Sequence, residues 1–427
     1  MKVLIVGGGG REHAIALKIK ENPEVTALYA APGNGGIAQI ATCLPFKATD
    51  VDGIVRWAAE NKVDFVIVAP DDPLCLGMVD ALAEQGIPAF GPRKNAAIIE
   101  GSKVFSKNLM KKYGIPTAAY ETFDDYDAAV KYLQTADMPI VVKADGLALG
   151  KGVLICPDRE NAVEAVASMM KEAKFGASGA RVVIEEFLTG PEVSVLALTD
   201  GKTVKPMVSS MDHKRALDHD EGLNTGGMGT IAPNPCYTPE LAQRCMDEIF
   251  LPTIAAMNAE GRTFTGCLYF GLMMTPKGPK VIEYNCRFGD PETQVVLPLL
   301  KSDLLTIMRA TVDGTLADTP VEFASGAACC VVLASGGYPV SYKSGYPISG
   351  LDEAGKTATV FHAGTKLVDG QIVTAGGRVL GVTATADTLE AAIDKAYQAA
   401  DKITFTDMHM RRDIGQRALA SRKESHS

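Results

Sequence analysis

The chain has 427 residues, of which 47% are hydrophobic and 22% charged, and its formal net charge is −9. This length predicts several domains, and the acidic balance argues against general affinity for nucleic acid or for an anionic membrane surface. Nine cysteines without a CxxC pair, and a first apolar run of only Val3–Val6, indicate a reduced, cytoplasmic protein with no signal peptide and no membrane-spanning stretch.

The first hundred residues alternate short apolar runs with amphipathic helical patterns. These patterns predict three strands and three helices, the strands at Val3–Val6, Thr26–Ala30 and Phe65–Ala69 and the helices at Arg11–Glu21, Val51–Asn61 and Leu76–Glu84. Strands that alternate with helices are typical of a doubly wound parallel sheet, in which ligands bind at the carboxyl ends of the strands.

A helix is expected over Ala96–Tyr113, and Gly114-Ile115-Pro116-Thr117 marks a domain boundary. The rest of the chain predicts mixed α+β structure, with strands at Pro139–Val142, Val153–Ile155, Arg181–Glu185, Ala327–Leu333 and Val379–Thr383, helices at Asn161–Lys171 and Leu389–Ala399, and a hairpin of Val193–Leu198 with Val204–Val208. The polar tail 417–427 is expected to fray.

A run of four glycines, Gly7–Gly10, follows the first predicted strand and leads into a helix. A dinucleotide-binding turn would need a third glycine where Glu12 and His13 stand, and an acidic residue at the end of the second strand, which instead ends at Tyr29-Ala30-Ala31. What remains is a general anion site at a helix N-terminus, so a sugar phosphate is favoured over NAD. Asn34 and Gly35, in the second glycine-rich turn, can add backbone amides to it.

A second glycine-rich loop, Asp145–Gly152, lies between two predicted strands. Lys143 ends the first strand and Lys151 lies in the loop, so two cations and flexible backbone amides can close over phosphate oxygens. The GxxxxGK[ST] pattern is absent, so this is not a Walker A loop. Downstream, the strand that contains Glu185 leads into a hinge whose backbone can read an adenine edge, while Glu192 can accept from ribose hydroxyls.

The most informative stretch is Val281–Glu292. In the strand that its apolar start predicts, Glu283 and Asn285 share one face. They present a carboxylate and an amide oxygen, a pair suited to Mg²⁺ held jointly with nucleotide phosphates. Arg287 follows with a planar fork that can grip a carboxylate or a phosphate.

These motifs resemble the phosphoribosylamine–glycine ligase family of the ATP-grasp superfamily. The similarity runs in order through Gly9-Gly10-Arg11-Glu12-His13, Pro32-Gly33-Asn34, Glu100-Gly101-Ser102-Lys103, Lys143-Ala144-Asp145-Gly146-Leu147-Ala148, Asp212-His213-Lys214-Arg215, Asn224-Thr225-Gly226-Gly227-Met228-Gly229 and Asn285-x-Arg287-Phe288-Gly289-Asp290-Pro291-Glu292. The chain departs from the family pattern at Asp71, where a glutamate is usual, and at Met211 and Leu223, where glutamine and proline are common.

The resemblance implies an α/β multidomain fold. Its expected parts are an N-terminal doubly wound parallel-sheet domain at 1–117, an ATP-grasp lid at 118–190, a central catalytic α+β domain at 191–326 and a small C-terminal α+β domain at 327–427. It also implies a reaction in which ATP activates glycine as glycyl phosphate and 5-phosphoribosylamine takes up the glycyl group. Glycine, the amine and ATP are then the partners, Mg²⁺ or Mn²⁺ is the metal, and a monomer is expected.

The resemblance also implies roles for individual residues. ATP is expected against Lys103, Lys143, Gly146, Gly150, Lys151, Gly152, Glu185, Glu186, Phe187, Leu188 and Glu192. The sugar phosphate is expected against Gly9, Gly10, Arg11, Glu12, Asn34, Gly35 and Asp71. Glycine and its activated form are expected against Asp212, Gly226, Gly227, Met228, Arg287 and Asp290, the metal on Glu283 and Asn285, and catalysis by Arg287, Asp212, Lys143 and Lys214.

Three other functions stay open from the sequence. Another ATP-grasp ligase or a biotin-dependent carboxylase would use formate or bicarbonate instead of glycine. An NAD-dependent oxidoreductase is weakened by the missing third glycine. A nucleotide-binding regulator without activity is disfavoured because Lys103, Lys143, Glu283, Asn285 and Arg287 are all present. His13 and His213 are expected to be structural hydrogen-bond partners more often than bases.

Overall fold

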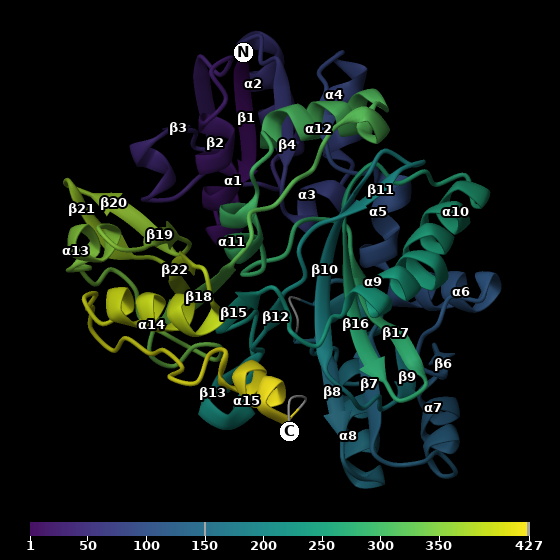
Figure 1. Ribbon diagram of the computed structural model, residues 1–427. Coiled ribbons are helices and arrows are strands. Elements are labelled where there is room, and N and C mark those ends of the chain that lie inside the picture. The colour runs from purple at the N-terminus through teal and green to yellow at the C-terminus, as the bar shows by residue number, and fades with distance from the viewer. Residues whose placement is uncertain (149–150, 425–427) are drawn as a thin grey trace.

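The computed structural model describes residues 1–148 and 151–424 (Figure 1). Its N-terminal part is a five-stranded parallel sheet in the order β3-β2-β1-β4-β5. The strands are β1 (Lys2–Gly7), β2 (Ala27–Pro32), β3 (Thr42–Cys43), β4 (Phe65–Val68) and β5 (Ala89–Phe90). The helices are α1 (Gly10–Lys20), α2 (Val51–Glu60), α3 (Asp71–Cys75), α4 (Met78–Glu84) and α5 (Lys94–Gly101). The predicted doubly wound sheet is confirmed.

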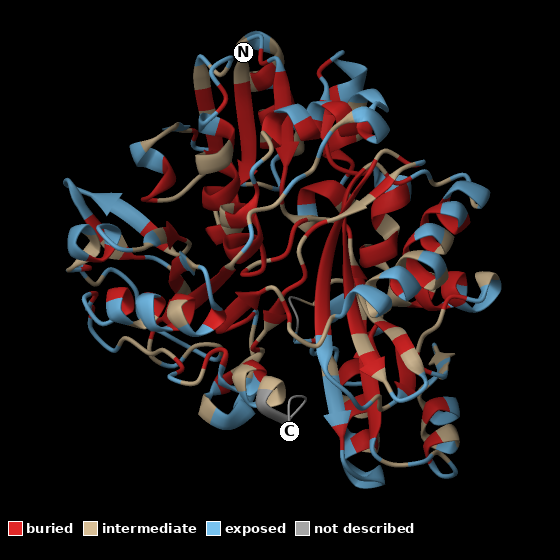
Figure 2. Ribbon diagram, in the orientation of Figure 1, coloured by how far each residue is buried: buried red, intermediate tan, exposed pale blue. Residues whose placement is uncertain are grey.

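Strand β1 is buried on both faces, as an apolar run in a parallel sheet requires (Figure 2). Leu4 faces the core that contains α2 and α4, and Ile5 faces the core formed with α1. Helix α12 (Leu304–Asp313) returns from far along the chain and joins the second core. The carboxyl end of β1 is approached by a different segment, since the amide of Arg11, at the start of α1, donates to Asp290 at 3.1 Å.

The single helix expected over Ala96–Tyr113 is two helices, α5 and α6 (Lys103–Tyr113). Ser102 has extended backbone angles, and its hydroxyl caps α6 by accepting a hydrogen bond from the amide of Phe105 at 3.1 Å. The amphipathic pattern continues through this break, which is why periodicity alone does not reveal it.

Two antiparallel four-stranded sheets follow, in the orders β6-β9-β7-β8 and β11-β10-β16-β17. The first consists of β6 (Tyr120–Phe123), β7 (Ile140–Ala144), β8 (Val153–Cys156) and β9 (Val182–Glu186), covered by α7 (Tyr126–Leu133) and α8 (Arg159–Met170). The second consists of β10 (Glu192–Thr199), β11 (Val204–Pro206), β16 (Gly266–Thr275) and β17 (Gly278–Asn285), with α9 (Pro239–Cys245), a π-helical turn (Met246–Phe250) and α10 (Leu251–Ala259) packed on it. The predicted hairpin of β10 and β11 is confirmed.

The last sheet has five antiparallel strands in the order β12-β15-β18-β22-β19. Its strands are β12 (Met211–Asp212), β15 (Gly229–Ala232), β18 (Ala327–Ala334), β19 (Thr359–His362) and β22 (Arg378–Ala386), with α13 (Leu351–Gly355) and α14 (Leu389–Ala400) packed on them. Two small hairpins are attached, β13 (Arg215–Leu217) with β14 (Glu221–Asn224) and β20 (Thr365–Val368) with β21 (Gln371–Thr374). β12 and β15 precede β18 by about a hundred residues, yet they belong to the same sheet. The loop that joins β12 to β15 is therefore held at the C-terminal sheet.

Fraying was expected over 417–427, but Gln416–Glu424 form helix α15, and residues 425–427 lie outside the described residues. Arg417 pairs with Asp220 at 2.6 Å, which ties the start of this helix to the β13–β14 hairpin. Within 1–148 and 151–424, we find no helix with both the length and the apolarity needed to cross a membrane.

Candidate active site

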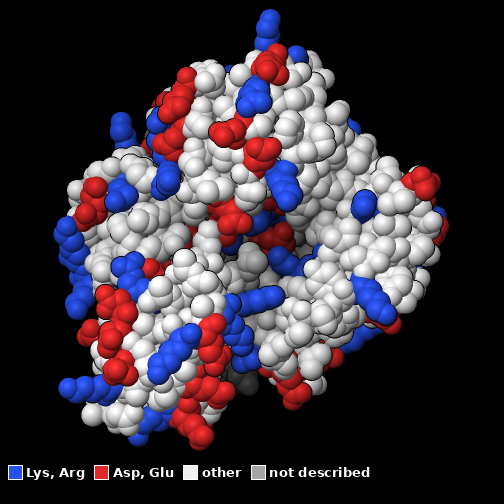
Figure 3. All heavy atoms as spheres, turned by 180° about the vertical axis from the view of Figure 1, so that it is seen from behind, with Lys and Arg blue, Asp and Glu red and all other residues white. Residues whose placement is uncertain are grey.

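Two neighbouring cavities lie where the N-terminal, antiparallel and C-terminal sheets meet. The larger, of about 930 Å³, opens between the two ATP-grasp-like sheets and the C-terminal sheet, and the smaller, of about 390 Å³, lies between the two glycine-rich turns and the C-terminal sheet. Seen from behind, the molecule has a central hollow in which acidic and basic side chains gather (Figure 3). The excess of ionic groups indicates a site for charged ligands.

Lys143 ends strand β7 and lies buried in the larger cavity. Its ammonium pairs with Glu185 of β9 and donates to the carbonyl of Ile282 at 3.2 Å. The other oxygen of Glu185 pairs with Lys107 of α6 at 2.6 Å, so one carboxylate holds two lysines. Burial lowers the pKa of Lys107 to about 8. The Glu185 side chain therefore positions Lys143 instead of facing outward at a hinge.

The glycine-rich loop is fixed at its start by contacts with helix α6. Lys103 donates to the carbonyl of Gly146 at 2.9 Å, and Asp145 accepts from the Ser102 hydroxyl and pairs with Arg181 at 2.6 Å. Lys151, at the far side of the loop, reaches the carbonyl of Pro339 in the C-terminal part at 3.3 Å. Gly150 lies outside the described residues.

Glu283 and Asn285 both lie on β17, as predicted, and both line the larger cavity. Glu283 has Lys214 at 3.9 Å, and although burial works to raise its pKa, Lys214, Lys143 and Lys103 hold that pKa below its ordinary value. The amide nitrogen of Asn285 donates to the carbonyl of Tyr284 at 2.9 Å, and its side-chain oxygen accepts no hydrogen bond from the described residues. An ionised carboxylate and an amide oxygen are therefore available side by side.

Arg287 is held by two acidic groups from the N-terminal half of the chain. Its guanidinium lies 3.2 Å from Glu100, whose other oxygen accepts from the amide of Cys286 at 2.7 Å. Asp71 begins helix α3, and Arg287 with Arg11 hold its pKa below the ordinary value against the effect of burial. The buried Nε of Arg287 has no hydrogen-bond partner among the described residues. This nitrogen is the donor that a bound anion could satisfy.

Asp212 and Glu292 form an acidic pair on the same cavity. Burial and the neighbouring Glu292 raise the pKa of Asp212 well above its ordinary value, and burial raises that of Glu292. A cation that binds next to two such carboxyl groups lowers their pKa values and stabilises their ionised forms. Lys214 lies on the same loop, and Glu192 at 3.5 Å is the largest cause of its raised pKa.

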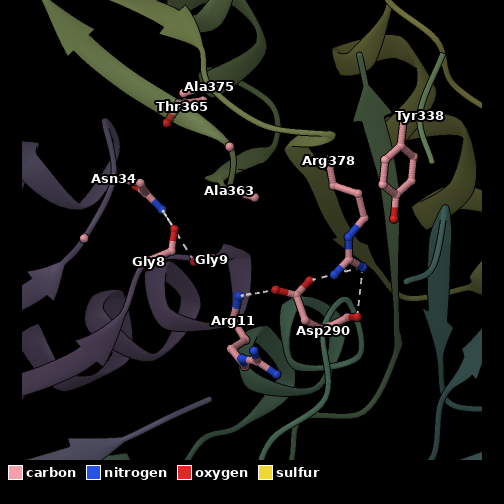
Figure 4. A pocket seen from close by; sticks show the side chains of 12 residues that line it. Gly8, Gly9, Arg11, Asn34, Asp290, Tyr338, Ala363, Thr365, Ala375 and Arg378 are labelled. Atoms are coloured by element: carbon pink, nitrogen blue, oxygen red, sulfur yellow. Dashed lines mark hydrogen bonds and ion pairs between the residues drawn. The ribbon is translucent and has the colours of Figure 1, made fainter. Parts of the chain in front are cut away.

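Carboxylates of the protein already occupy two of the backbone amides at the helix N-terminus after the first glycine turn. Glu12 accepts from the amide of Gly9 at 2.7 Å, and Asp290 accepts from the amide of Arg11 at 3.1 Å. Asn34, in the second turn, donates to the carbonyls of Gly8 at 2.9 Å and His362 at 2.8 Å (Figure 4). The free anion site expected at this helix is therefore smaller than the sequence indicates.

The two cavities gather most of the predicted residues. The larger is lined by Arg11, Asp71, Lys103, Lys143, Lys151, Gly152, Glu185, Glu186, Phe187, Leu188, Glu192, Asp212, Lys214, Gly226, Glu283, Asn285, Arg287 and Asp290. The smaller is lined by Gly9, Arg11, Asn34 and Asp290. Neither is lined by Gly10, Glu12, Gly35, Gly146, Gly227 or Met228, of which Met228 is completely buried.

Several residues of the site carry no role in the sequence interpretation, among them Glu100, Lys107, Glu292, Tyr338 and Arg378. Lys107 gives one local signal, since it lies between Val104 and Met110 on the apolar side of α6 and must therefore have a buried partner. Glu100 is an acid in an otherwise apolar turn of α5. Arg378 and Tyr338 give no such signal, because their partners lie about a hundred residues away.

His213 is a structural residue. Its Nδ1 lies 3.1 Å from the carbonyl of Gly229, and its Nε2 accepts from the amide of Gly415 at 3.1 Å, so the ring is neutral with the proton on Nδ1. Burial lowers its pKa from 6.5 to about 4. His13 likewise accepts from the amide of His362 at 2.7 Å, and burial lowers its pKa to about 3.

The His213 environment predicts a pH-dependent stability. The unfolded chain takes up a proton on this ring below pH 6.5, and the folded protein does so only near pH 4. Stability is therefore full above pH 6.5 and falls as the pH is lowered towards 4, by about 1.4 kcal/mol per pH unit. In His213→Gln, we expect the plot of unfolding free energy against pH to be shallower by that amount, as measured by urea denaturation. The exposed His219→Gln is the control, and equal slopes in all three proteins would contradict the assignment.

Comparison with known proteins agrees with the site. Three family models match the chain: "Phosphoribosylglycinamide synthetase, N domain" over residues 1–100, its "ATP-grasp (A) domain" over 101–293 and its "C domain" over 328–417. The chain is 48% identical over 425 residues to a phosphoribosylamine–glycine ligase of Halalkalibacterium halodurans, covering 100% of this chain and 99% of that protein. It is 47% identical to one of Vibrio cholerae, covering 98% of this chain and 99% of the relative.

Solved structures show the same fold. A crystal structure of phosphoribosylamine–glycine ligase from Thermotoga maritima matches with a TM-score of 0.86 and 34% identity, covering 97% of this chain and all of that one. The biotin carboxylase domain of the Hydrogenobacter thermophilus 2-oxoglutarate carboxylase matches with a TM-score of 0.73 at 18% identity, covering 96% of this chain and 91% of that one, a likeness of fold alone.

The two antiparallel sheets that enclose a lysine-lined cleft, together with the matched ATP-grasp domain, define an ATP-grasp ligase. The three domain matches occur in order along one chain. The chain belongs to the phosphoribosylamine–glycine ligase family.

Proposed function

We propose that this protein uses ATP to join glycine to 5-phosphoribosylamine, yielding glycinamide ribonucleotide, ADP and phosphate in purine biosynthesis. The observation that carries the proposal is the composition of the larger cavity. Lysines suited to phosphates, the Glu283–Asn285 pair, the Arg287 guanidinium and the acidic pair of Asp212 with Glu292 all line one space of about 930 Å³. A nucleotide, a divalent metal and a small zwitterion would find complementary groups there.

ATP would lie between the two antiparallel sheets. Lys143 and Lys103 would neutralise its phosphates, and the loop containing Gly146 and Lys151 would close over them. Glu186, Phe187 and Leu188, which follow β9, would present backbone groups to the adenine, and Glu192 would accept from the ribose. Lys107 would act through Glu185, by holding Lys143 in place.

A divalent metal fits the Glu283–Asn285 pair by the chemistry of its donors. Glu283 is ionised, and the side-chain oxygen of Asn285 accepts no hydrogen bond from the described residues. No group of three His, Cys, Asp or Glu residues in the described chain forms a cation cage. This suits Mg²⁺, or Mn²⁺ in its place, which takes one or two protein oxygens and completes its shell with phosphates and water. When bound, the metal would neutralise charge on the phosphates of ATP.

Glycine would bind with its ends at opposite charges. Its ammonium would face Asp212, and its carboxylate would face the Arg287 guanidinium, which lines the cavity. Carboxylate attack on the γ-phosphoryl of ATP gives glycyl phosphate, and the fixed guanidinium would hold the attacking oxygen in line. Lys214, also next to Glu283, would share in neutralising the charge on the new acyl phosphate.

The amine substrate would then attack the glycyl carbonyl, form the amide bond and release phosphate. Glycyl phosphate hydrolyses readily, so water must be excluded while the amine approaches. The sheet of residues 118–190 would close as a lid over the central domain of 191–326, with the domains of 1–117 and 327–427 holding the sugar phosphate. We infer a cytoplasmic monomer with no nucleic-acid partner.

Product analysis tests this function. The protein is incubated with ATP, Mg²⁺, isotopically labelled glycine and phosphoribosylamine generated in the reaction, and the products are examined by mass spectrometry. We expect the label in a compound that contains both glycine and ribose phosphate. Label that stays in free glycine, while bicarbonate or formate enters a product instead, would refute the choice of acid.

A further inference from the structure

The smaller cavity must recognise a phosphate if the proposed function holds, yet two of the backbone amides expected to do so are occupied by carboxylates of the protein. The amide of Gly9 is taken by Glu12 at 2.7 Å, and the amide of Arg11 is taken by Asp290 at 3.1 Å. Both oxygens of Asp290 are in turn used, since Gln294 donates to the second at 2.8 Å. Among the described residues, the amides of Gly8, Gly10 and Glu12 keep no acceptor. The turn therefore offers some backbone donors, and charged side chains of the cavity would add to them.

Two cations line this cavity, Arg11 and Arg378. Arg11 uses two of its nitrogens, because its Nε pairs with Glu12 at 2.9 Å and its Nη1 donates to the carbonyl of Phe288 at 3.1 Å. Arg378 begins β22 and approaches from the C-terminal sheet on the other side of the cavity (Figure 4). The two differ in how many of their donors are still available.

Every hydrogen bond that Arg378 makes within the described chain comes from Nη1. That nitrogen donates to the carbonyls of Gly226 at 2.8 Å and Asp290 at 2.9 Å. It also lies 3.6 Å from the Asp290 carboxylate, which offsets part of the charge. Within residues 1–148 and 151–424, Nη2 and Nε have no acceptor. One edge of the guanidinium is thus anchored and the other is left for a ligand.

Gly226 keeps this guanidinium in place. A Cβ atom at that position would lie 2.8 Å from Cζ and 2.9 Å from Nη2 of Arg378, closer than atoms can pack. The amide of Gly226 donates to the hydroxyl of Tyr338 at 3.0 Å, and both Tyr338 and Arg378 line the two cavities. The arginine therefore lies at the boundary between the smaller cavity and the place proposed for glycine.

We propose that Arg378 is a substrate-binding residue that recognises the phosphate of the ribosylamine substrate through its free Nη2 and Nε donors. A planar fork with a rigid anchor suits a phosphate, and hydrogen bonds to a charged group are stronger than neutral ones. The proposal rests on the proposed function and deepens it. It adds a phosphate contact from the C-terminal sheet to the backbone contacts that the glycine turn was expected to make.

The test uses ribose 5-phosphate as a stable probe and ribose as its uncharged counterpart. In Arg378→Gln, we expect the dissociation constant of ribose 5-phosphate to rise at least about tenfold, which is the loss of one charge-assisted contact. The KM for the amine should rise in parallel, while the KM values for glycine and ATP stay within about twofold. Arg412→Gln, in the same part of the chain but in an exposed pair with Asp401, is the control.

Two results would overturn the proposal. One is unchanged ribose 5-phosphate binding in Arg378→Gln with a raised KM for glycine, which would mean that the residue acts only on the Gly226–Gly227 loop. The other is unchanged ribose 5-phosphate binding in Arg378→Lys. This variant keeps a positive charge next to the carbonyls that Arg378 contacts, so it can be used if the glutamine variant does not fold. Wild-type protein that forms no glycine-containing product would instead refute the proposed function.

Discussion

Arg287→Lys is expected to lower kcat/KM for glycine by roughly a hundredfold. The guanidinium spans Glu100 at 3.2 Å and the carbonyl of Phe288 at 3.2 Å while its Nε stays unpartnered, so it can hold a carboxylate and its protein partners together. Lysine keeps the charge but has a single ammonium in place of the fork. Loss of charge-assisted contacts of about 1.5–3 kcal/mol corresponds to this factor.

Steady-state kinetics with varied glycine measures the effect. Arg309→Lys, in an exposed pair with Glu24, is the matched control and should behave as wild type. Circular dichroism would show whether the variant still folds with Glu100 next to a lysine. Near-normal turnover of Arg287→Lys at ordinary glycine concentrations would show that the Arg287 guanidinium is not needed to hold the glycine carboxylate.

Glu283→Gln is expected to raise the metal concentration for half-maximal activity by at least about tenfold and to lower kcat at saturating ATP. The substitution keeps the shape of the side chain and removes the ionised oxygen. The Asn285 amide is then left without the charged partner that a hard cation prefers. Glu283 also pairs with Lys214, so the substitution removes the negative partner of a lysine that is proposed to neutralise phosphate.

Activity is measured against Mg²⁺ and, separately, Mn²⁺, with ATP in fixed excess. Glu248→Gln, which removes an exposed carboxylate paired with Arg244, controls for the loss of one negative charge. An identical metal dependence in Glu283→Gln and wild type would show that the metal is not held here.

Local patterns predict much of this fold because most of its strands are buried apolar runs. The runs at Val3–Val6 and Ala327–Leu333 are recognised for that reason, and both correspond to strands, β1 and β18. The break at Ser102 is missed because the apolar spacing continues across it, and helix α15 is missed because its sequence is polar. The membership of β12 and β15 in the C-terminal sheet is also invisible to a local pattern, since their partner β18 lies far along the chain.

In the candidate site, too, local sequence patterns predict some of the residue contacts and miss others. Glu283, Asn285 and Arg287 are close in sequence, and one strand and the turn after it bring them to one cavity. The carboxylates that occupy the glycine turn are different, because Asp290 contacts Arg11 across 279 residues. No spacing rule reports such a contact, so the turn looks more open in sequence than it is in the folded protein.

The measurement that tests the account most directly is phosphate release from ATP, with phosphoribosylamine generated in the reaction and glycine added or withheld. We predict release that requires both glycine and the amine. Release that ignores glycine but responds to bicarbonate or formate, or no release with any of these acids, would contradict the ligase function proposed for this protein.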